Sequence, residues 1–195
     1  MSIEVSRKLL ILDLDETLLH GTLHPLDRPE DFRVGKHFVY LRPHLGGFLT
    51  FCADHFNVAV WTSSSQDYAD AVVERLFGST DNLAFLWARP RCTLRYDIEL
   101  QEHYWVKDLK KVRLRGYRLE QVIVVDDTPQ KHERNYGNLV QVQEYNGSSE
   151  DDELTFLSRY LEMLSTVENV RTVDKRNWRQ RLDATADARL AFDGI

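Results

Sequence analysis

The chain has 195 residues, of which 43% are hydrophobic, enough for one domain with a substantial core. Its formal net charge of −6 argues against a general nucleic-acid-binding protein. The two cysteines, Cys52 and Cys92, form no metal-binding pattern, and the first eight residues are too polar for a signal peptide. Since no apolar run reaches membrane-spanning length, we expect a cytoplasmic protein, or a nuclear one in a eukaryotic host, with no membrane partner.

The first predicted strand is the unbroken apolar run at residues 9–12, which is typical of a strand buried on both faces of a parallel sheet. Asp13 and Asp15 follow it directly, where open α/β sheets bind their ligands. One aspartate alone would more often cap a turn. A pair is expected to have a cation beside it, because burying unpartnered carboxylates is costly. Mg²⁺ fits best, since it binds one or two carboxylates together with water and phosphate oxygens.

Strands and helices then alternate, which predicts an α/β fold with a doubly wound, mostly parallel sheet. Further strands are expected at residues 56–61, 83–87, 122–125 and 139–142, and helices at 43–55, 68–77 and 149–164. Two segments interrupt this order. Residues 20–41 predict a flap or β-hairpin, and residues 89–101 predict a loop or small β insert near the site. Neither is long enough for a large cap domain.

The chain after residue 172 differs in composition from the rest. We expect residues 1–172 to form the α/β domain and residues 173–195 to form a charged C-terminal helix or tail. Trp178, Leu182 and Leu190 are spaced apolar residues in this segment. They suit a helix that packs loosely on the domain, although a solvated tail is equally compatible with the composition.

Groups that suit a phosphate and a metal occur at the predicted strand ends. They are Asp13 and Asp15, Thr62 and Ser63, and Asp126 and Asp127, with Lys107 just ahead of the strand at 122–125. The carboxyl ends of parallel strands meet at one edge of a sheet, so we expect these residues to share one pocket. Alone, Lys107 would more often be a solvated surface lysine and Thr62 a helix cap.

These residue types together predict phosphoryl transfer through a covalent intermediate. Asp13, at the strand end, suits a nucleophile that attacks phosphorus and forms an aspartyl-phosphate. Asp15 suits the general acid and base that protonates the leaving oxygen and then deprotonates water. Mg²⁺ held by Asp13 and the later aspartate pair would offset the negative charge. Thr62, the backbone N–H groups after it, and Lys107 would bind the phosphoryl oxygens.

Five segments in consistent order resemble motifs of a known family. They are Leu12-Asp13-Leu14-Asp15-Glu16-Thr17-Leu18, Arg42-Pro43-His44, Trp61-Thr62-Ser63-Ser64-Ser65-Gln66-Asp67-Tyr68-Ala69-Asp70, Tyr104-Trp105-Val106-Lys107-Asp108-Leu109 and Val124-Val125-Asp126-Asp127-Thr128-Pro129. This set resembles the haloacid dehalogenase (HAD) superfamily, in the branch of CTD-phosphatase-like proteins of the FCP/SCP or NIF type. The resemblance covers residues 8–172 and leaves only the charged tail unmatched.

The resemblance implies a Mg²⁺-dependent phosphatase that acts on phosphoprotein Ser, Thr or Tyr. It implies that Asp13 is the nucleophile and Asp15 the acid and base. It also implies that Mg²⁺ is bound by Asp13, the Asp15 backbone carbonyl and the last motif. Members of this branch usually have Asp-Asn where this chain has Asp126-Asp127. Since the second position is the usual ligand, we expect Asp127 to bind the metal, with Asp126 close by.

The same resemblance assigns residues that touch the substrate. Thr62 corresponds to the phosphate-binding threonine and Lys107 to the motif lysine, with Ser63 adjacent to the phosphate. Tyr68 and Arg89 fall where family members contact substrate. The family's flap accepts a proline-containing phosphopeptide, and Leu23 and Pro25 stand in the corresponding region of this chain.

Other functions remain open from the sequence alone. An end-phosphatase for nucleic acid could use Arg89, Arg91, Arg95 and the basic segment 110–118 along a phosphate backbone, although a solvated helix face explains that segment as well. A non-catalytic HAD-like tether would be expected to carry a membrane anchor or a degraded motif, and this chain has neither. A phosphotransferase would need a cap that excludes water, and none is evident.

Overall fold

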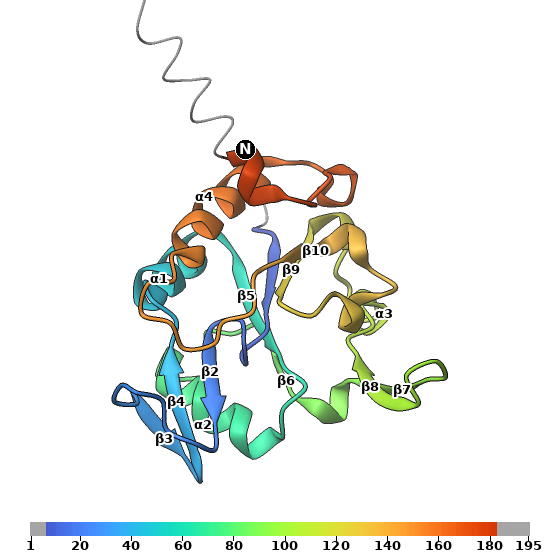
Figure 1. Ribbon diagram of the computed structural model, residues 1–195. Coiled ribbons are helices and arrows are strands. Elements are labelled where there is room, and N and C mark those ends of the chain that lie inside the picture. The colour runs from blue at the N-terminus through green and yellow to red at the C-terminus, as the bar shows by residue number, and fades with distance from the viewer. Residues whose placement is uncertain (1–6, 183–195) are drawn as a thin grey trace, which may run out of the picture.

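The central sheet of the molecule is parallel, as the alternation of strands and helices predicts. The computed structural model describes residues 7–182, and within them this sheet has five strands in the order β10-β9-β1-β5-β6 (Figure 1). The strands are β1 (Leu9–Leu12), β5 (Asn57–Trp61), β6 (Leu86–Trp87), β9 (Val122–Asp126) and β10 (Leu139–Gln141). Because β1 comes first in the chain but lies in the middle, later strands add on both of its sides, which makes the sheet doubly wound.

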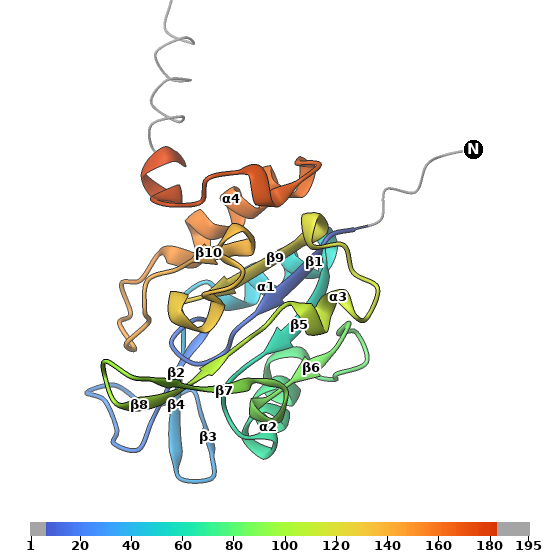
Figure 2. The same cartoon turned by 90° about the vertical axis from the view of Figure 1, so that its right-hand side faces the viewer.

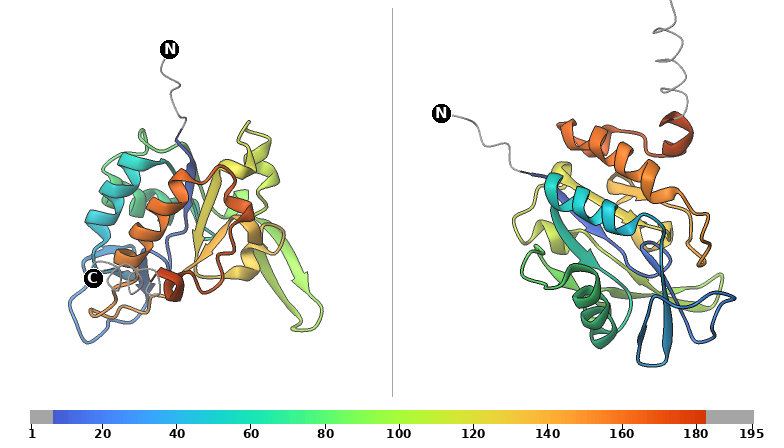
Figure 3. Two further views of the ribbon diagram at one scale, coloured as in Figure 1. Left: turned by 90° about the horizontal axis from the view of Figure 1, so that it is seen from above. Right: turned by 90° about the vertical axis from the view of Figure 1, so that its left-hand side faces the viewer.

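Strand β1 is apolar throughout because both of its faces are buried. The α-helices are α1 (Leu45–His55), α2 (Gln66–Phe77), α3 (Lys110–Arg113) and α4 (Glu153–Thr166). Leu10 and Leu12 pack in one core with residues of α1, α2 and α4, whereas Leu9 and Ile11 pack in a second core that includes α3. Figure 3 shows α1 and α4 side by side on one face of the sheet.

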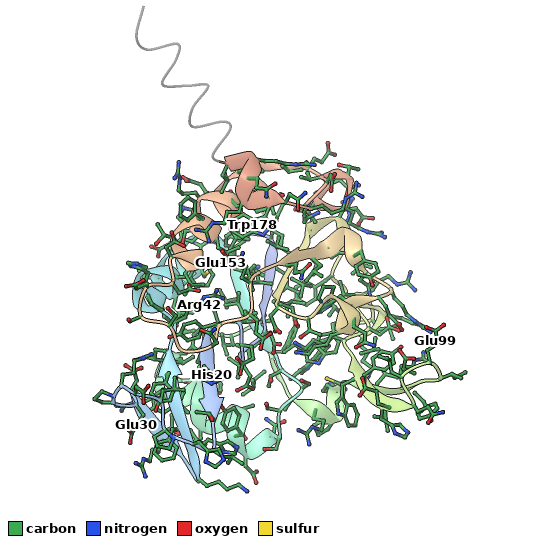
Figure 4. The ribbon with its side chains drawn as sticks, viewed as in Figure 1. His20, Glu30, Arg42, Glu99, Glu153 and Trp178 are labelled. Carbon is green, nitrogen blue, oxygen red and sulfur yellow. The ribbon has the colours of Figure 1, made fainter. Side chains whose placement is uncertain are left out.

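Two small antiparallel elements extend beyond the carboxyl ends of the sheet strands (Figures 1 and 2). The first is the flap, with strands β2 (Leu19–Thr22), β3 (Phe32–Val34) and β4 (His37–Leu41) in the order β2-β4-β3. The second is the hairpin of β7 (Thr93–Asp97) and β8 (Glu102–Val106). Glu30 on the flap and Glu99 at the hairpin's free end lie on opposite sides of the molecule (Figure 4). Both predicted inserts are therefore present, and neither is a cap domain.

Several predicted elements begin at residues other than those expected. Helix α4 begins at Glu153 rather than at 149, because Asp151 accepts the hydrogen bond of the Glu153 backbone N–H while its carboxylate pairs with Arg42. Helix α1 begins two residues after Pro43, since His44 has left-handed backbone geometry, with φ 66°. The strand predicted at 83–87 is regular only over the two residues of β6.

The described part of the C-terminal segment packs on the domain. Trp178 is buried in the main core, its ring stacks on Tyr160 of α4 with centroids 5.2 Å apart, and its Nε1 donates to the Gln141 carbonyl at 2.7 Å. Figure 4 shows Trp178 close to Glu153, which pairs with Arg179 at 2.6 Å. Residues 183–195, with the predicted apolar contact Leu190, lie outside the described residues. The division of the chain at residue 172 stays a prediction.

Candidate active site

The carboxyl ends of β1 and β9 bring the predicted acids together. The two strands pair in parallel with Leu12 beside Val125, so Asp13 and Asp126 leave the sheet next to each other. The Asp13 backbone N–H donates to the Val125 carbonyl at 3.0 Å, which continues the ladder past the end of β1. Thr62 follows β5 on the other side of β1, as the expected convergence requires.

Lys107 is an interior residue that joins these two acids. Its Nζ lies 2.9 Å from Asp13 Oδ1 and 2.5 Å from Asp126 Oδ2, and all three side chains are at most 2% exposed. Burial alone would raise the pKa of Asp126, but Lys107, His132 and Lys131 hold it well below its ordinary value. Lys107 directly follows β8, so the small β insert positions it. The reading of Lys107 as a solvated surface lysine is wrong.

Asp15 lies in a different environment from Asp13. It accepts hydrogen bonds from Ser64 Oγ at 2.6 Å and from Tyr68 OH at 2.8 Å. Burial raises the pKa of Asp15 above its ordinary value, and these two hydrogen bonds only partly oppose the shift. A Cβ at Gly21 of the flap would lie 2.4 Å from the Tyr68 hydroxyl, so glycine is needed there to leave room for it.

The loop after β5 carries the residues expected to bind phosphate. Thr62 is buried, and its hydroxyl accepts the Ser64 backbone N–H at 3.1 Å. Arg89 is exposed, and its Nε donates to the Ser63 carbonyl at 2.7 Å. Thr62, Ser63 and Arg89 are therefore held in one small region beside Asp15. Tyr68, expected to contact substrate, is engaged with Asp15 from the adjoining helix α2.

Three carboxylates make up a possible metal site, which we call the three-aspartate cluster: Asp13, Asp126 and Asp127. One oxygen of each lies within 4.8 Å of the others. Thr17 Oγ1 donates to Asp127 Oδ1 at 3.2 Å, and Thr128 Oγ1 donates to Asp127 Oδ2 at 2.7 Å. Hard, charged oxygen donors of this kind suit Mg²⁺. The Asp15 side chain is directed instead toward Ser64 and Tyr68.

Sequence reasoning missed two residues that contact this cluster. Lys131 Nζ lies 3.0 Å from Asp13 Oδ2, and His132 Nε2 lies 2.9 Å from Asp126 Oδ2. Both belong to the 3₁₀ turn Pro129–His132 that follows the aspartate pair. Proline suits the first turn of a helix, so a turn that folds back after Pro129 could have been inferred. Sequence reasoning also gave no role to Ser64, whose hydroxyl donates to Asp15.

A buried arginine supports the three-aspartate cluster indirectly, through Thr17. Arg42 donates to the Thr17 carbonyl at 2.9 Å and makes two hydrogen bonds, at 2.7 and 2.8 Å, with the carboxylate of Asp151. Thr17 in turn bonds Asp127 through its hydroxyl. The Arg42-Pro43-His44 motif therefore fixes the loop after β1 to the start of α4, although it contributes no group to the site itself.

Comparison with known proteins identifies the family. The family model described as NLI interacting factor-like phosphatase matches residues 8–171. CTD nuclear envelope phosphatase 1 of Xenopus tropicalis is 32% identical over 192 residues, which span 91% of this chain and 75% of that protein. A probable C-terminal domain small phosphatase of Dictyostelium discoideum is 30% identical over 176 residues, which span 87% of this chain and 54% of that protein.

A solved structure agrees with the fold. The fission yeast RNA polymerase II CTD phosphatase Fcp1, bound to beryllium fluoride, superposes with a TM-score of 0.56 at 18% identity. The match covers 83% of this chain and 50% of that one. The HAD-like fold inferred from the motifs is thus confirmed. The chain belongs to the NLI interacting factor-like phosphatase family and is a phosphatase with a HAD-like fold.

Proposed function

We propose that this phosphatase hydrolyses phosphomonoesters through an aspartyl-phosphate on Asp13. The observation that carries the proposal is the contrast between two acids of one motif. Asp13 is flanked by the ammonium groups of Lys107 and Lys131 at 2.9 and 3.0 Å, whereas Asp15 is bonded by hydroxyls and has a raised pKa. Acids whose environments differ in this way suit different roles, one as nucleophile and one as proton donor.

The reaction then divides into two displacements. The Asp13 carboxylate attacks phosphorus while the bond to the leaving oxygen breaks, and Asp15 gives its proton to that oxygen. Asp15 next accepts a proton from water, the water oxygen attacks phosphorus, and inorganic phosphate leaves with the Asp13 carboxylate restored. Lys107 offsets negative charge throughout, and the Thr62 loop binds the phosphoryl oxygens.

A magnesium requirement is part of the proposal. The three-aspartate cluster supplies carboxylate oxygens close enough together to hold one ion, and that donor set matches the preference of Mg²⁺. Asp127 fits the expected role of ligand because Thr17 and Thr128 hold it beside Asp13. When bound, the metal would neutralise charge between the carboxylates and the substrate phosphate.

We propose a phosphoprotein as the substrate. The relatives named CTD phosphatases support this class, and so does the surface next to the Thr62 loop. A groove of about 480 Å³ is lined there by Gln66, Arg89, Pro90 and Trp105 among others. An apolar and aromatic wall beside one cation suits a phosphorylated side chain with its flanking peptide. On the flap, Leu23 is 48% exposed and available to the same peptide.

Two of the arginines that suggested the nucleic-acid alternative do not support it. Arg91 lies over the ring of Trp87 at 4.9 Å, and Arg115 over that of Phe85 at 5.3 Å. These guanidinium groups therefore pack on aromatic rings of the second core instead of forming a free basic track. Phosphate-backbone binding would need several unpaired cations along one surface.

The proposed cellular location rests on the name of a relative. The Xenopus protein is named for the nuclear envelope, and we propose a nuclear location for this chain on that basis. The cytoplasmic location expected from composition has no support from these names and stays a prediction. Among residues 7–182, no helix combines the length and hydrophobicity that crossing a bilayer requires.

The test is phosphate release from an aryl phosphate, with and without Mg²⁺, by the native protein and by Asp13→Asn. Asp54→Asn, an exposed aspartate of α1, is the matched control. We expect Mg²⁺-dependent turnover that Asp13→Asn abolishes and Asp54→Asn retains. Turnover by Asp13→Asn would exclude Asp13 as the nucleophile. A phosphopeptide and a 5′-phosphorylated oligonucleotide, compared at two salt concentrations, then test the substrate class, and the peptide should be preferred at both.

A further inference from the structure

Lys131 occupies the centre of the three-aspartate cluster. Its Nζ lies 3.0 Å from Asp13 Oδ2, 3.6 Å from Asp126 Oδ1 and 3.9 Å from Asp127 Oδ1. One ammonium group therefore faces one oxygen of each acid expected to hold a metal. An Mg²⁺ ion requires such oxygens at about 2.0–2.1 Å. The ion and the ammonium group cannot occupy this place together.

The two lysines of the site use different oxygens. Lys107 contacts Asp13 Oδ1 and Asp126 Oδ2, whereas Lys131 contacts the other oxygen of each, together with Asp127. There are thus two separate positions for a cation, and only the position of Lys131 includes all three acids. Lys107 already fills the fully enclosed position, so the metal position is the one that Lys131 occupies.

The charges at the site also favour a metal ion at the position of Lys131. Three carboxylates and the one ammonium group of Lys107 leave two negative charges, which a divalent ion balances. The Lys131 ammonium group lies within 3.9 Å of an oxygen of each of the three carboxylates, so the same attraction holds it that would hold Mg²⁺.

Lys131 also has a way out of the cluster. Its side chain is 19% exposed, compared with 1% for Lys107. The ammonium group is carried by a flexible four-carbon stem on a 3₁₀ turn at the surface of the site. We propose that Lys131 is an internal competitor of Mg²⁺: it neutralises the three-aspartate cluster in the metal-free protein and moves to solvent when the ion binds. This inference rests on the proposed metal site.

The competition is measured by calorimetric titration of metal-free protein with MgCl₂, which needs no turnover. Lys131→Met should bind Mg²⁺ about 5- to 150-fold more tightly than the native protein, the usual range for coupling between two binding events. Lys110→Met removes an exposed lysine of α3 and should leave the dissociation constant unchanged. Equal or weaker binding by Lys131→Met overturns the inference while leaving the metal site intact. Binding by neither protein overturns the metal site and the inference together.

A second experiment uses the native protein and does not depend on the variant folding. An amine-reactive acylating reagent is applied with and without Mg²⁺, and the modified lysines are identified by mass spectrometry. Release of Lys131 predicts that Mg²⁺ increases its modification, while Lys107 stays protected and Lys110 reacts equally in both samples. Unchanged or decreased modification of Lys131 at saturating Mg²⁺ would contradict the displacement.

Discussion

The two sides of the active site differ although the motif Leu12–Leu18 supplies one acid to each. On the side of β9, Asp13 and Asp126 are almost fully buried and are held by charged groups, chiefly Lys107. On the side of β5, Asp15 is held by the hydroxyls of Ser64 and Tyr68. On the first side, carboxylates are paired with ammonium groups. On the second side, a carboxylate accepts hydrogen bonds from neutral hydroxyl groups.

The difference has a cause in the strand order. Asp13 leaves β1 beside β9, which also ends in acids, so their mutual repulsion must be offset by cations. Asp15, two residues on, faces the loop after β5, where the chain offers Thr and Ser. A buried carboxylate beside cations is favoured in its ionised form, as a nucleophile requires. A buried carboxylate with fewer charge partners binds its proton more tightly, as a general acid requires.

The largest expected combined loss of stability and activity comes from removing Lys107, the cation of the charged side. Lys107→Met leaves Asp126 and Asp13 buried with one ammonium group fewer. Breaking a buried ion pair from one side costs about 3–5 kcal/mol, and losing a charge-stabilising donor lowers kcat by roughly 10²–10³. Urea unfolding and aryl phosphate hydrolysis measure the two losses, with Lys110→Met as the control. Full stability in Lys107→Met would show that the acids do not depend on this pairing.

The next prediction distinguishes the roles of Asp13 and Asp15 in turnover. Asp15→Asn should lower turnover by roughly 10²–10⁴, the usual contribution of general acid–base catalysis. An aryl phosphate with a good leaving group needs little protonation, so one equivalent of phenol per site should appear quickly before turnover stops. Rapid mixing detects this burst, and Asp13→Asn should show none. A burst from Asp13→Asn would reverse the assigned roles.

Asp15→Asn should also change how stability depends on pH. The folded-state pKa of Asp15 is raised, so the folded protein binds this proton more tightly than the unfolded chain does. Its contribution to stability is therefore lost as pH rises from the ordinary aspartate value through the raised one. Asp15→Asn should lack that decline, and near neutral pH it should be no less stable than the native protein. Urea titrations at several pH values measure this difference.

A third variant weakens the charged side without removing a charge. Thr17→Val keeps the buried shape but removes the hydroxyl that donates to Asp127 Oδ1 and accepts the Asp127 backbone N–H, both at 3.2 Å. Loss of such support for a metal ligand typically costs 10- to 100-fold in metal affinity, so Mg²⁺ binding should weaken by about that factor. Calorimetry tests this, with the exposed Thr50→Val as the control. Unchanged affinity would argue that Asp127 does not bind the metal.

The parts of this site that follow strands were predicted from the sequence, and the residues on the turn after Pro129 were missed. Asp13, Thr62 and Asp126 follow apolar runs, and the convergence of parallel strand ends places them together without further information. Lys107 was predicted from its place ahead of the strand at 122–125, the company of the aspartates and its motif, since nothing in its local pattern indicates burial. Lys131 reaches the cluster only because a 3₁₀ turn folds the chain back.

Contacts between distant segments were equally hidden. Arg42 pairs with Asp151, 109 residues later, and α4 begins at Glu153 rather than at the predicted residue 149. Trp178 was expected either to contact the domain from a loosely packed helix or to lie in a solvated tail, and its ring is buried against Tyr160. Neither position follows from a periodic pattern, because each depends on which surface the finished core leaves open.

The smallest expected effect tests the neutral side alone. Tyr68→Phe removes one of two hydrogen bonds to the ionised form of Asp15, so the pKa of Asp15 should rise further. The dephosphorylation step needs Asp15 without its proton, and the first step needs it protonated. Both limbs of the pH–rate profile should therefore move to higher pH.

The magnitude of this change separates positioning from substrate binding. A hydrogen bond to a charged group is worth at least about 1.5 kcal/mol, and at that lower limit the change in kcat near neutral pH should be roughly tenfold. Tyr136→Phe, which changes a tyrosine that is 58% exposed, is the control and should leave the profile in place. If Tyr68 served only to bind substrate, Tyr68→Phe would raise KM and leave both limbs where they are. A shifted profile with an unchanged KM assigns the hydroxyl to Asp15, because loss of a substrate contact alone would raise KM and leave the pKa of Asp15 in place.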